Sequence, residues 1–125
     1  MTIQGALDYA DQLKPNMMSR QMKIAFLTEI EQLFHQEVVM KHEHTEEQET
    51  MPAYDVDTEP GTELVVPDPY SMMYVYWLMA KIDLQNLEED KWDRDTQRFE
   101  QAYGTAGDWW TREHMPIQKN PYFRL

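Results

Sequence analysis

The chain has 125 residues, a length typical of one domain with one modest core. It contains no cysteine, which excludes disulfide bonds and thiolate sites and fits a reducing cytoplasm, and its formal net charge of -12 disfavours tight binding to the phosphates of DNA. Its longest apolar run, Met72 to Ala80, is too short to cross a bilayer, and its first residues do not read as a signal peptide, so we expect neither export nor a membrane location.

Two amphipathic helices are predicted in the first third of the chain. Thr2 is a candidate N-cap for a helix that ends near Leu13, because apolar residues recur there at helical spacing. Pro15 interrupts the pattern, and Ser19 is the candidate N-cap of a second helix that ends near Lys41. The second helix is expected to bury one stripe and to expose Glu29, Glu31 and Gln32; the buried stripe is Met22, Phe26, Leu27, Ile30, Leu33, Phe34 and Val38.

Helical periodicity is lost over residues 42–67, which we name the acidic segment. We predict a long loop or a β-hairpin arm, in which residues 53–56 pair with residues 63–66 through a type II turn at 59–62. An isolated hairpin is marginally stable, so a neighbouring subunit is expected to support it. The segment has no Lys or Arg between positions 42 and 66 but holds eight acids: Glu43, Glu46, Glu47, Glu49, Asp55, Asp57, Glu59 and Glu63.

The third predicted helix has Asp68 as its N-cap and Pro69 at its first position, and it ends near Gln85. Nine of the ten residues from Ser71 to Ala80 are apolar or aromatic, which is more than one buried face requires. We therefore expect one side of this helix in the core and another against a neighbouring subunit, the alternative being that all of these side chains only fill the core. The predicted interface residues are Met72, Met73, Tyr76, Trp77 and Met79.

A fourth helix is predicted over residues 88–111, and an extended tail follows it. The expected buried stripe of this helix is Trp92, Phe99, Tyr103, Ala106 and Trp110, and the expected ion pairs on its exposed side are Asp90 with Arg94 and Lys91 with Asp95. The fold class is therefore all-α: a small bundle of about four helices forms a domain over residues 1–114, with the acidic segment inserted. The tail, residues 115–125, combines prolines with large apolar side chains, which suits docking on a partner; a frayed terminus is the alternative.

No group of residues predicts catalysis or a bound cofactor. The segment His42–His44, with His35 upstream, could suggest a metal site, but an irregular loop does not fix ligands, and solvated histidines are the better interpretation. A calcium loop that starts at Asp55 fails because Pro60 stands at its sixth position. The four glycines stand apart, which argues against a phosphate loop, and both serines precede predicted helices. We therefore expect no metal, no cofactor and no enzymatic activity.

Two blocks of sequence resemble small head-tail connector (adaptor) proteins, which are encoded in the structural modules of siphovirus-type phages and prophages. The first block is residues 3–9 with Lys14, Pro15 and Asn16. The second follows the family's order and spacing: Glu63 to Tyr70, Tyr74, Leu78 to Asp83, Asn86, Glu88, Phe99, Ala102, Tyr103, Trp109 and Arg112. Two positions depart from the pattern. Leu87 stands where a Gly is expected after Asn86, and Asp108 stands where the family tends to be basic.

The resemblance implies a helical subunit of the virion that is assembled in the host bacterial cytoplasm. About a dozen copies would form a ring under the portal protein, extend the DNA channel without binding DNA specifically, and receive the next neck, stopper or tail-completion protein. We expect the eight acids to face the channel or that next protein. We expect the tail to dock on the portal through Ile117, Pro121, Tyr122, Phe123 and Leu125.

Three other classes of function are weighed against this interpretation. Another neck or tail-completion protein is the nearest alternative. An acidic inhibitor that mimics DNA would spread its acids along helices, whereas here they concentrate in one segment broken by prolines. An enzyme is the least favoured, because no nucleophile, phosphate loop or ligand set is found.

Overall fold

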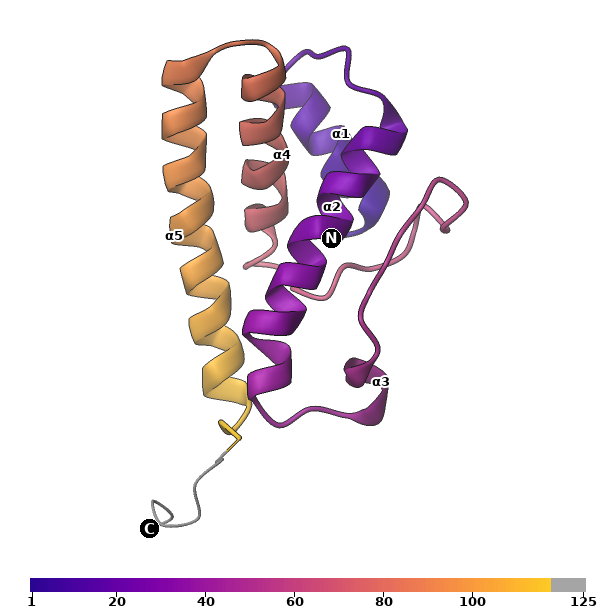
Figure 1. Cartoon of the computed structure of the whole chain (residues 1–125), viewed down its shortest axis with the longest axis vertical. Helices are drawn as coiled ribbons and strands as arrows, with labels where there is room; N and C mark the ends of the chain where they lie inside the picture. The colour runs from indigo at the N-terminus through magenta and orange to yellow at the C-terminus, as the bar shows by residue number, and fades with distance from the viewer. Residues whose placement is uncertain (118–125) are drawn as a thin grey trace.

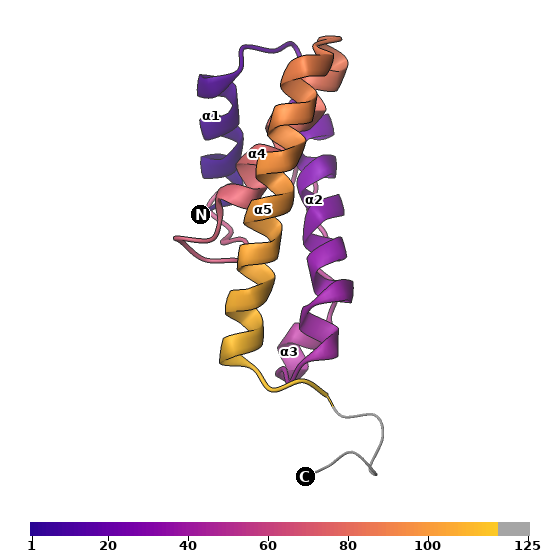
Figure 2. The same ribbon diagram turned by 90° about the vertical axis from the view of Figure 1, so that its left-hand side faces the viewer.

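The computed structural model describes residues 1–117, and its helices pack side by side. The elements are α1 (Ile3–Leu13), α2 (Arg20–Glu37), the 3-10 turn η1 (Val39–Lys41), α3 (Glu46–Glu49), α4 (Met72–Gln85) and α5 (Glu89–Glu113). Helix α4 lies between α5 on one side and α1 with α2 on the other (Figure 1 and Figure 2). The predicted all-α helical bundle is confirmed. Within residues 1–117, no helix is long and apolar enough to span a membrane.

The first two helices begin where their cap residues predict. The Thr2 hydroxyl accepts a hydrogen bond from the Gly5 N–H at 2.9 Å, and the Ser19 hydroxyl accepts one from the Met22 N–H at 3.1 Å. Each bond satisfies an N–H that has no partner inside its helix, and such a cap stabilises a helix by about 1 kcal/mol.

Helix α4 forms the centre of the core because neighbouring helices cover it on several sides. Its buried residues are Met73, Tyr74, Val75, Leu78, Met79, Ala80, Ile82 and Asp83. Each fully buried large apolar side chain stabilises the fold by about 1.5–3 kcal/mol. Most of the apolar run of this helix is therefore explained by packing inside one subunit.

Aromatic rings join α2 to α5 at the end of the bundle away from the α4–α5 connection. The ring of Phe34 meets the rings of Tyr103 and Trp110 edge to face, at centroid distances of 5.9 and 6.1 Å. His114 stacks on Trp110 at 3.9 Å. This geometry suits the quadrupoles of the rings and adds to the energy of burial.

The predicted stripe of α2 is rotated in the structure. Met22 and Leu33 are exposed, whereas Ile24, Glu31 and His35 are buried. The reason is that the acidic segment lies along α2 and covers a side of the helix that was expected to face solvent. The Thr28 hydroxyl bonds both the N–H and the carbonyl of Tyr54, and Gln32 donates to the carbonyl of Pro52.

The predicted β-hairpin does not form. Among the described residues there is no strand, and residues 63–66 pair with the start of α1 instead of with residues 53–56. The Leu64 N–H donates to the Met1 carbonyl, and the Ile3 N–H donates to the Thr62 carbonyl, both at 3.0 Å. The backbone groups that a hairpin would satisfy are thus satisfied by another part of the chain.

The turn at residues 59–62 is present but is not type II. The Thr62 N–H donates to the Glu59 carbonyl at 3.0 Å, as a turn requires. A type II turn needs a positive φ at its third residue, and Gly61 does not have one.

Helix α4 begins later than the sequence pattern predicts. Its first residue is Met72 and its N-cap is Ser71, because the chain first makes a turn in which the Tyr70 N–H donates to the Pro67 carbonyl at 2.9 Å. Asp68 accepts a hydrogen bond from the Ser71 hydroxyl and so stays close to the helix start without being its cap.

The end of α4 is a Schellman motif that contains a leucine where glycine is usual. The Glu88 N–H donates to the Asp83 carbonyl at 2.9 Å, and the Leu87 N–H donates to the Leu84 carbonyl at 3.2 Å. Leu87 therefore adopts a φ of 57°, and its side chain is 87% exposed. This is the position at which the sequence departs from the expected glycine.

Replacing Leu87 by glycine should stabilise the protein. A left-handed backbone costs an L-residue about 1–2 kcal/mol, and glycine avoids that cost at the expense of some unfolded-state entropy. We expect Leu87→Gly to raise the free energy of unfolding by about 1 kcal/mol, measured by urea denaturation. Leu87→Ala, which keeps the strained φ, is the control, and equal stability of the two variants would contradict this account.

Candidate functional site

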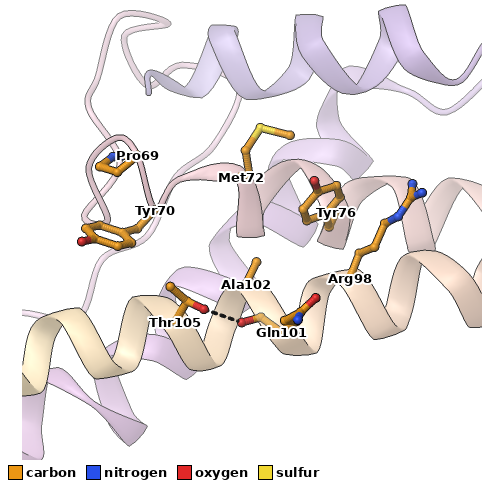
Figure 3. Close-up of a pocket in the computed structure, with 8 residues that line it drawn as sticks. All are labelled: Pro69, Tyr70, Met72, Tyr76, Arg98, Gln101, Ala102 and Thr105. Atoms are coloured by element: carbon orange, nitrogen blue, oxygen red, sulfur yellow. Dashed lines mark hydrogen bonds between the residues drawn. The ribbon is translucent and has the colours of Figure 1, made fainter.

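A groove lies on the surface between α4 and α5, and we name it the α4–α5 groove. It has a volume of about 200 Å³ and is lined by Pro69, Tyr70, Met72, Tyr76, Arg98, Gln101, Ala102 and Thr105. Figure 3 shows that the side chains of α4 and of the turn before it form one wall, while those of α5 form the other. Arg98 is the one charged residue among these eight.

Contacts around the α4–α5 groove hold its walls in place. Tyr70 stacks on Trp109 with ring centroids 5.4 Å apart, and the Tyr70 hydroxyl is 3.5 Å from Nη2 of Arg112. The Thr105 hydroxyl donates to the carbonyl of Gln101 at 3.0 Å, which fixes the side chain of Thr105 along the helix. A groove with fixed walls loses little conformational entropy when a partner binds.

A second, smaller depression lies on another side of the α4–α5 pair. It has a volume of about 130 Å³ and is lined by Trp77, Ala80, Lys81, Leu84, Trp92, Thr96 and Phe99. The Lys81 ammonium lies 4.3 Å from the Trp77 ring centre, and the Trp77 Nε1–H donates to the Phe26 carbonyl at 2.9 Å. A cation above an aromatic ring stabilises this arrangement and keeps part of the apolar surface covered.

The five residues predicted for a subunit interface fall into three groups. Met73 and Met79 are buried in the core, so they offer no surface to a partner in this structure. Met72 and Tyr76 line the α4–α5 groove, and Trp77 lines the smaller depression. The structure thus brings together only two of the five, and it adds Tyr70 and Arg98, which the hydrophobic pattern of α4 did not indicate.

All eight acids of the acidic segment are exposed. The segment is nevertheless fastened to α2 through Tyr54 and to α1 through Thr62, so it is not a free arm. Its short helix α3 has a complete capping box, in which Thr45 and Gln48 satisfy each other's backbone N–H. The eight carboxylates are therefore presented on a well-supported surface.

The predicted docking tail is only partly within the described residues. Ile117 is exposed, and its N–H donates to the Lys41 carbonyl at 3.0 Å, while the Glu43 N–H donates to the Met115 carbonyl at 2.8 Å. These bonds tie the chain after α5 to the chain after η1. Pro121, Tyr122, Phe123 and Leu125 lie outside the described residues.

The histidines hydrogen-bond with backbone carbonyl groups. His42 Nδ1 lies 2.6 Å from the Val38 carbonyl oxygen, and His44 Nδ1 lies 2.7 Å from the His42 carbonyl oxygen. His35 is buried, with Nε2 at 2.6 Å from the Gln48 carbonyl oxygen. Within residues 1–117, no group of three or more His, Cys, Asp or Glu could hold a metal ion.

The buried carboxylate of Glu31 is a feature that the sequence pattern missed. It accepts hydrogen bonds from the Tyr54 hydroxyl at 2.7 Å, from the Val65 N–H at 2.9 Å, and from the Tyr74 hydroxyl. Burial raises the pKa of Glu31, and the three hydrogen bonds oppose that rise. The spacing offers a signal, because Glu31 follows Leu27 by four residues and therefore lies on the apolar stripe.

A second buried cluster joins the end of α1 to α4 and α5. Lys14 Nζ lies 2.9 Å from Oδ1 of Asp83 and 3.1 Å from Oδ2 of Asp95, and both carboxyl groups are buried. Asp95 was expected to pair with Lys91 on the exposed side of α5, but Lys91 pairs with Glu88. Asp95 precedes Phe99 by four residues, so its place on the buried stripe could have been read from the spacing.

Two buried carboxyl groups face the Lys14 ammonium in this cluster, and Nη1 of Arg98 lies 3.6 Å from Oδ1 of Asp95. Burial raises the pKa of Asp83 to about 6, the Asp95 carboxylate acts in the same direction, and Lys14 opposes the rise. Burial would also raise the pKa of Asp95, but its hydrogen bonds with Asp83 and Lys14 lower that pKa. Below about pH 6, a proton shared by the pair therefore resides mainly on Asp83, and Asp95 carries the negative charge.

Comparisons with known proteins identify no relative of this chain. No model of a protein family, no curated protein and no solved structure matches the chain. The functional interpretation therefore rests on the sequence and on the geometry described above.

The Asp83 carboxyl should make stability fall as pH rises. The pKa of Asp83 is about 6 in the folded state and 3.8 in the unfolded chain, so the folded state binds the proton more tightly. The resulting stabilisation is complete below about pH 4 and is lost as the pH rises through 6. Relative to Asp83→Asn, which cannot ionise, the natural protein should lose on the order of 1–3 kcal/mol of unfolding free energy across this range. Urea denaturation at several pH values measures the difference, and a pH-independent difference would refute the assignment.

Proposed function

We propose that this chain is a structural subunit of a phage virion: a ring-forming head-tail connector, or adaptor, that docks under the portal. In this role it extends the DNA channel and provides the platform to which the next neck or tail protein attaches. The proposed role is structural and involves no catalytic step. Another neck or tail-completion protein is the alternative within the virion.

The observation that carries the proposal is that the two blocks of sequence resemblance meet in space. The first block includes the start of α1, and the second starts at Glu63. Lys14 of the first block pairs with Asp83 of the second, with Lys14 Nζ 2.9 Å from Asp83 Oδ1, and α1 packs against α4. The second block then continues into the α4–α5 pair that encloses the groove. Residues that resemble one family thus form one continuous structural unit.

Two surface features support a role in a ring around DNA. A closed ring needs two different contact faces on each subunit, and the α4–α5 groove is a candidate for one of them. About twelve copies, each with a formal charge of -12, would carry on the order of -140, which allows DNA to pass without adhering. We assign the exposed acids of Glu43 to Glu49 to the channel or to the next neck protein.

Electron microscopy of the purified protein, alone and mixed with portal-containing phage heads, tests the proposal. We expect rings with a central hole, either free in solution or at the portal vertex of the heads. Heads that lack the portal are the matched control and should carry no ring. A folded protein that stays monomeric with and without portal-containing heads would reject the proposed function.

Deleting residues 118–125 tests the assignment of the tail to the portal. The deletion leaves intact the bonds of Met115 and Ile117 to the chain after η1, so folding and ring formation should be unchanged. Cosedimentation with portal-containing heads should then decrease by at least about tenfold. Undiminished cosedimentation would show that the tail is not the docking element.

A further inference from the structure

A turn in the acidic segment presents one valine between two aspartates. Val56 is 53% exposed and is flanked by Asp55 and Asp57, which are also exposed. The Asp55 carboxylate accepts from the Asp57 N–H at 2.8 Å, and the Asp55 N–H donates to the Thr58 hydroxyl at 2.9 Å. These bonds hold residues 55–58, which we name the Val56 turn, in one conformation.

The Val56 turn is rigidly mounted on the subunit. Tyr54, directly before it, is bonded to Thr28 and Glu31 of α2, and Pro60, shortly after it, accepts from the Gln4 N–H of α1. A side chain that is held in place in this way binds with a small loss of conformational entropy. An exposed valine that neither α1 nor α2 covers is therefore available to another surface.

The cations of α5 lie on one face of that helix. Lys91, Arg94, Arg98 and Arg112 are separated by three, four and fourteen residues, and each of these spacings returns to nearly the same side of an α-helix. Arg98 belongs to the wall of the α4–α5 groove, and Arg112 contacts Tyr70 at its edge. The groove thus combines apolar side chains, among them Met72 and Ala102, with one cation, Arg98, whose Nη1 lies 3.6 Å from Oδ1 of Asp95.

The segment that contains the Val56 turn and helix α5, which forms one wall of the α4–α5 groove, lie at different edges of the subunit. In Figure 1, α5 forms one edge of the bundle, and the segment between α3 and α4 projects at the other edge. Two unlike patches placed apart on one molecule can join copies head to tail, which is the arrangement that a closed ring requires. The opposite charges of the two patches favour this contact over a contact between like patches.

We propose that the Val56 turn of one copy docks in the α4–α5 groove of a second copy. Val56 enters between Tyr76 and Ala102, and the Asp57 carboxylate pairs with the Arg98 guanidinium of that second copy. The proposal rests on the ring-forming function given above and names the two surfaces that form its repeated contact. It assigns Asp55 to Glu59 to the contact between subunits and leaves Glu43 to Glu49 for the channel or the neck.

A pair of cysteines tests the contact directly, because the chain has no cysteine of its own. Val56→Cys with Ala102→Cys should give disulfide-linked chains, up to closed rings, when assembled protein is oxidised with diamide. A link between these positions joins two chains, since α5 and the segment between α3 and α4 lie on opposite sides of the bundle (Figure 1). The matched control is Val56→Cys with Glu100→Cys, because Glu100 is exposed on another face of α5 and should not cross-link.

Exchange of charges provides an independent test. Asp57→Arg and Arg98→Asp should each weaken self-association, measured by sedimentation velocity, by about tenfold or more, and the two combined should restore most of it. Glu46→Arg makes the same charge change on α3 and should leave association unchanged. Because Arg98 also lies 3.6 Å from the buried Asp95, Arg98→Gln serves as a milder variant, and thermal unfolding checks its folding.

The outcomes separate this inference from the proposed function. The proposed contact would be wrong if rings form but do not cross-link through positions 56 and 102. It would also be wrong if Asp57→Arg and Glu46→Arg weaken self-association equally. Either result would leave the ring-forming function unaffected. Absence of any oligomer, with and without portal-containing heads, would overturn both. Cross-linking at the designed pair together with rescue by the charge exchange would establish the contact.

Discussion

The carboxylate of Glu31 determines where the acidic segment lies. It is 1% exposed and is surrounded by hydrogen-bond donors from three separate parts of the chain: Tyr54, Val65 and Tyr74. A buried carboxylate without such partners would cost several kcal/mol, so the fold is stable only if the segment lies against α2 and supplies them. The side of α2 that carries Glu31 is covered for this reason. The surface positions of the Val56 turn and of the exposed acids follow from the same constraint.

Charged groups inside the bundle also set the relation of α1 to the α4–α5 pair. Lys14 follows the last turn of α1 and reaches Asp83 on α4 and Asp95 on α5. An ammonium that pairs with two buried carboxyl groups contributes more to the specificity of packing than to net stability, because the cost of removing each charge from water offsets most of the attraction between them. The helices can therefore slide little against one another without leaving a buried charge unpaired. The walls of the α4–α5 groove are held in place for the same reason.

The sequence predicted the helices well because capping and periodicity are local properties. Thr2 and Ser19 begin α1 and α2, and the apolar run of α4 lies in the core. The path of the acidic segment could not be predicted in this way, since its partners are up to about 60 residues distant in the chain. Glu31 and Asp95 were assigned to solvent because acids usually are, although their spacing places them on buried stripes. Of the groove residues, the sequence indicated only Met72 and Tyr76 of α4, because the rest of the wall comes from α5 and from the turn at Tyr70.

The pairing of the chain after η1 with the chain after α5 has a mechanical consequence. His42 and Pro116 form an antiparallel bridge, with one backbone hydrogen bond on each side of it. A pull on the polypeptide beyond Ile117 is therefore shared between the ends of α2 and α5 and is not borne by one helix terminus alone. Tension applied there would reach the Ile117–Lys41 bond first and the Glu43–Met115 bond next, before it acts on the last turn of α5 alone.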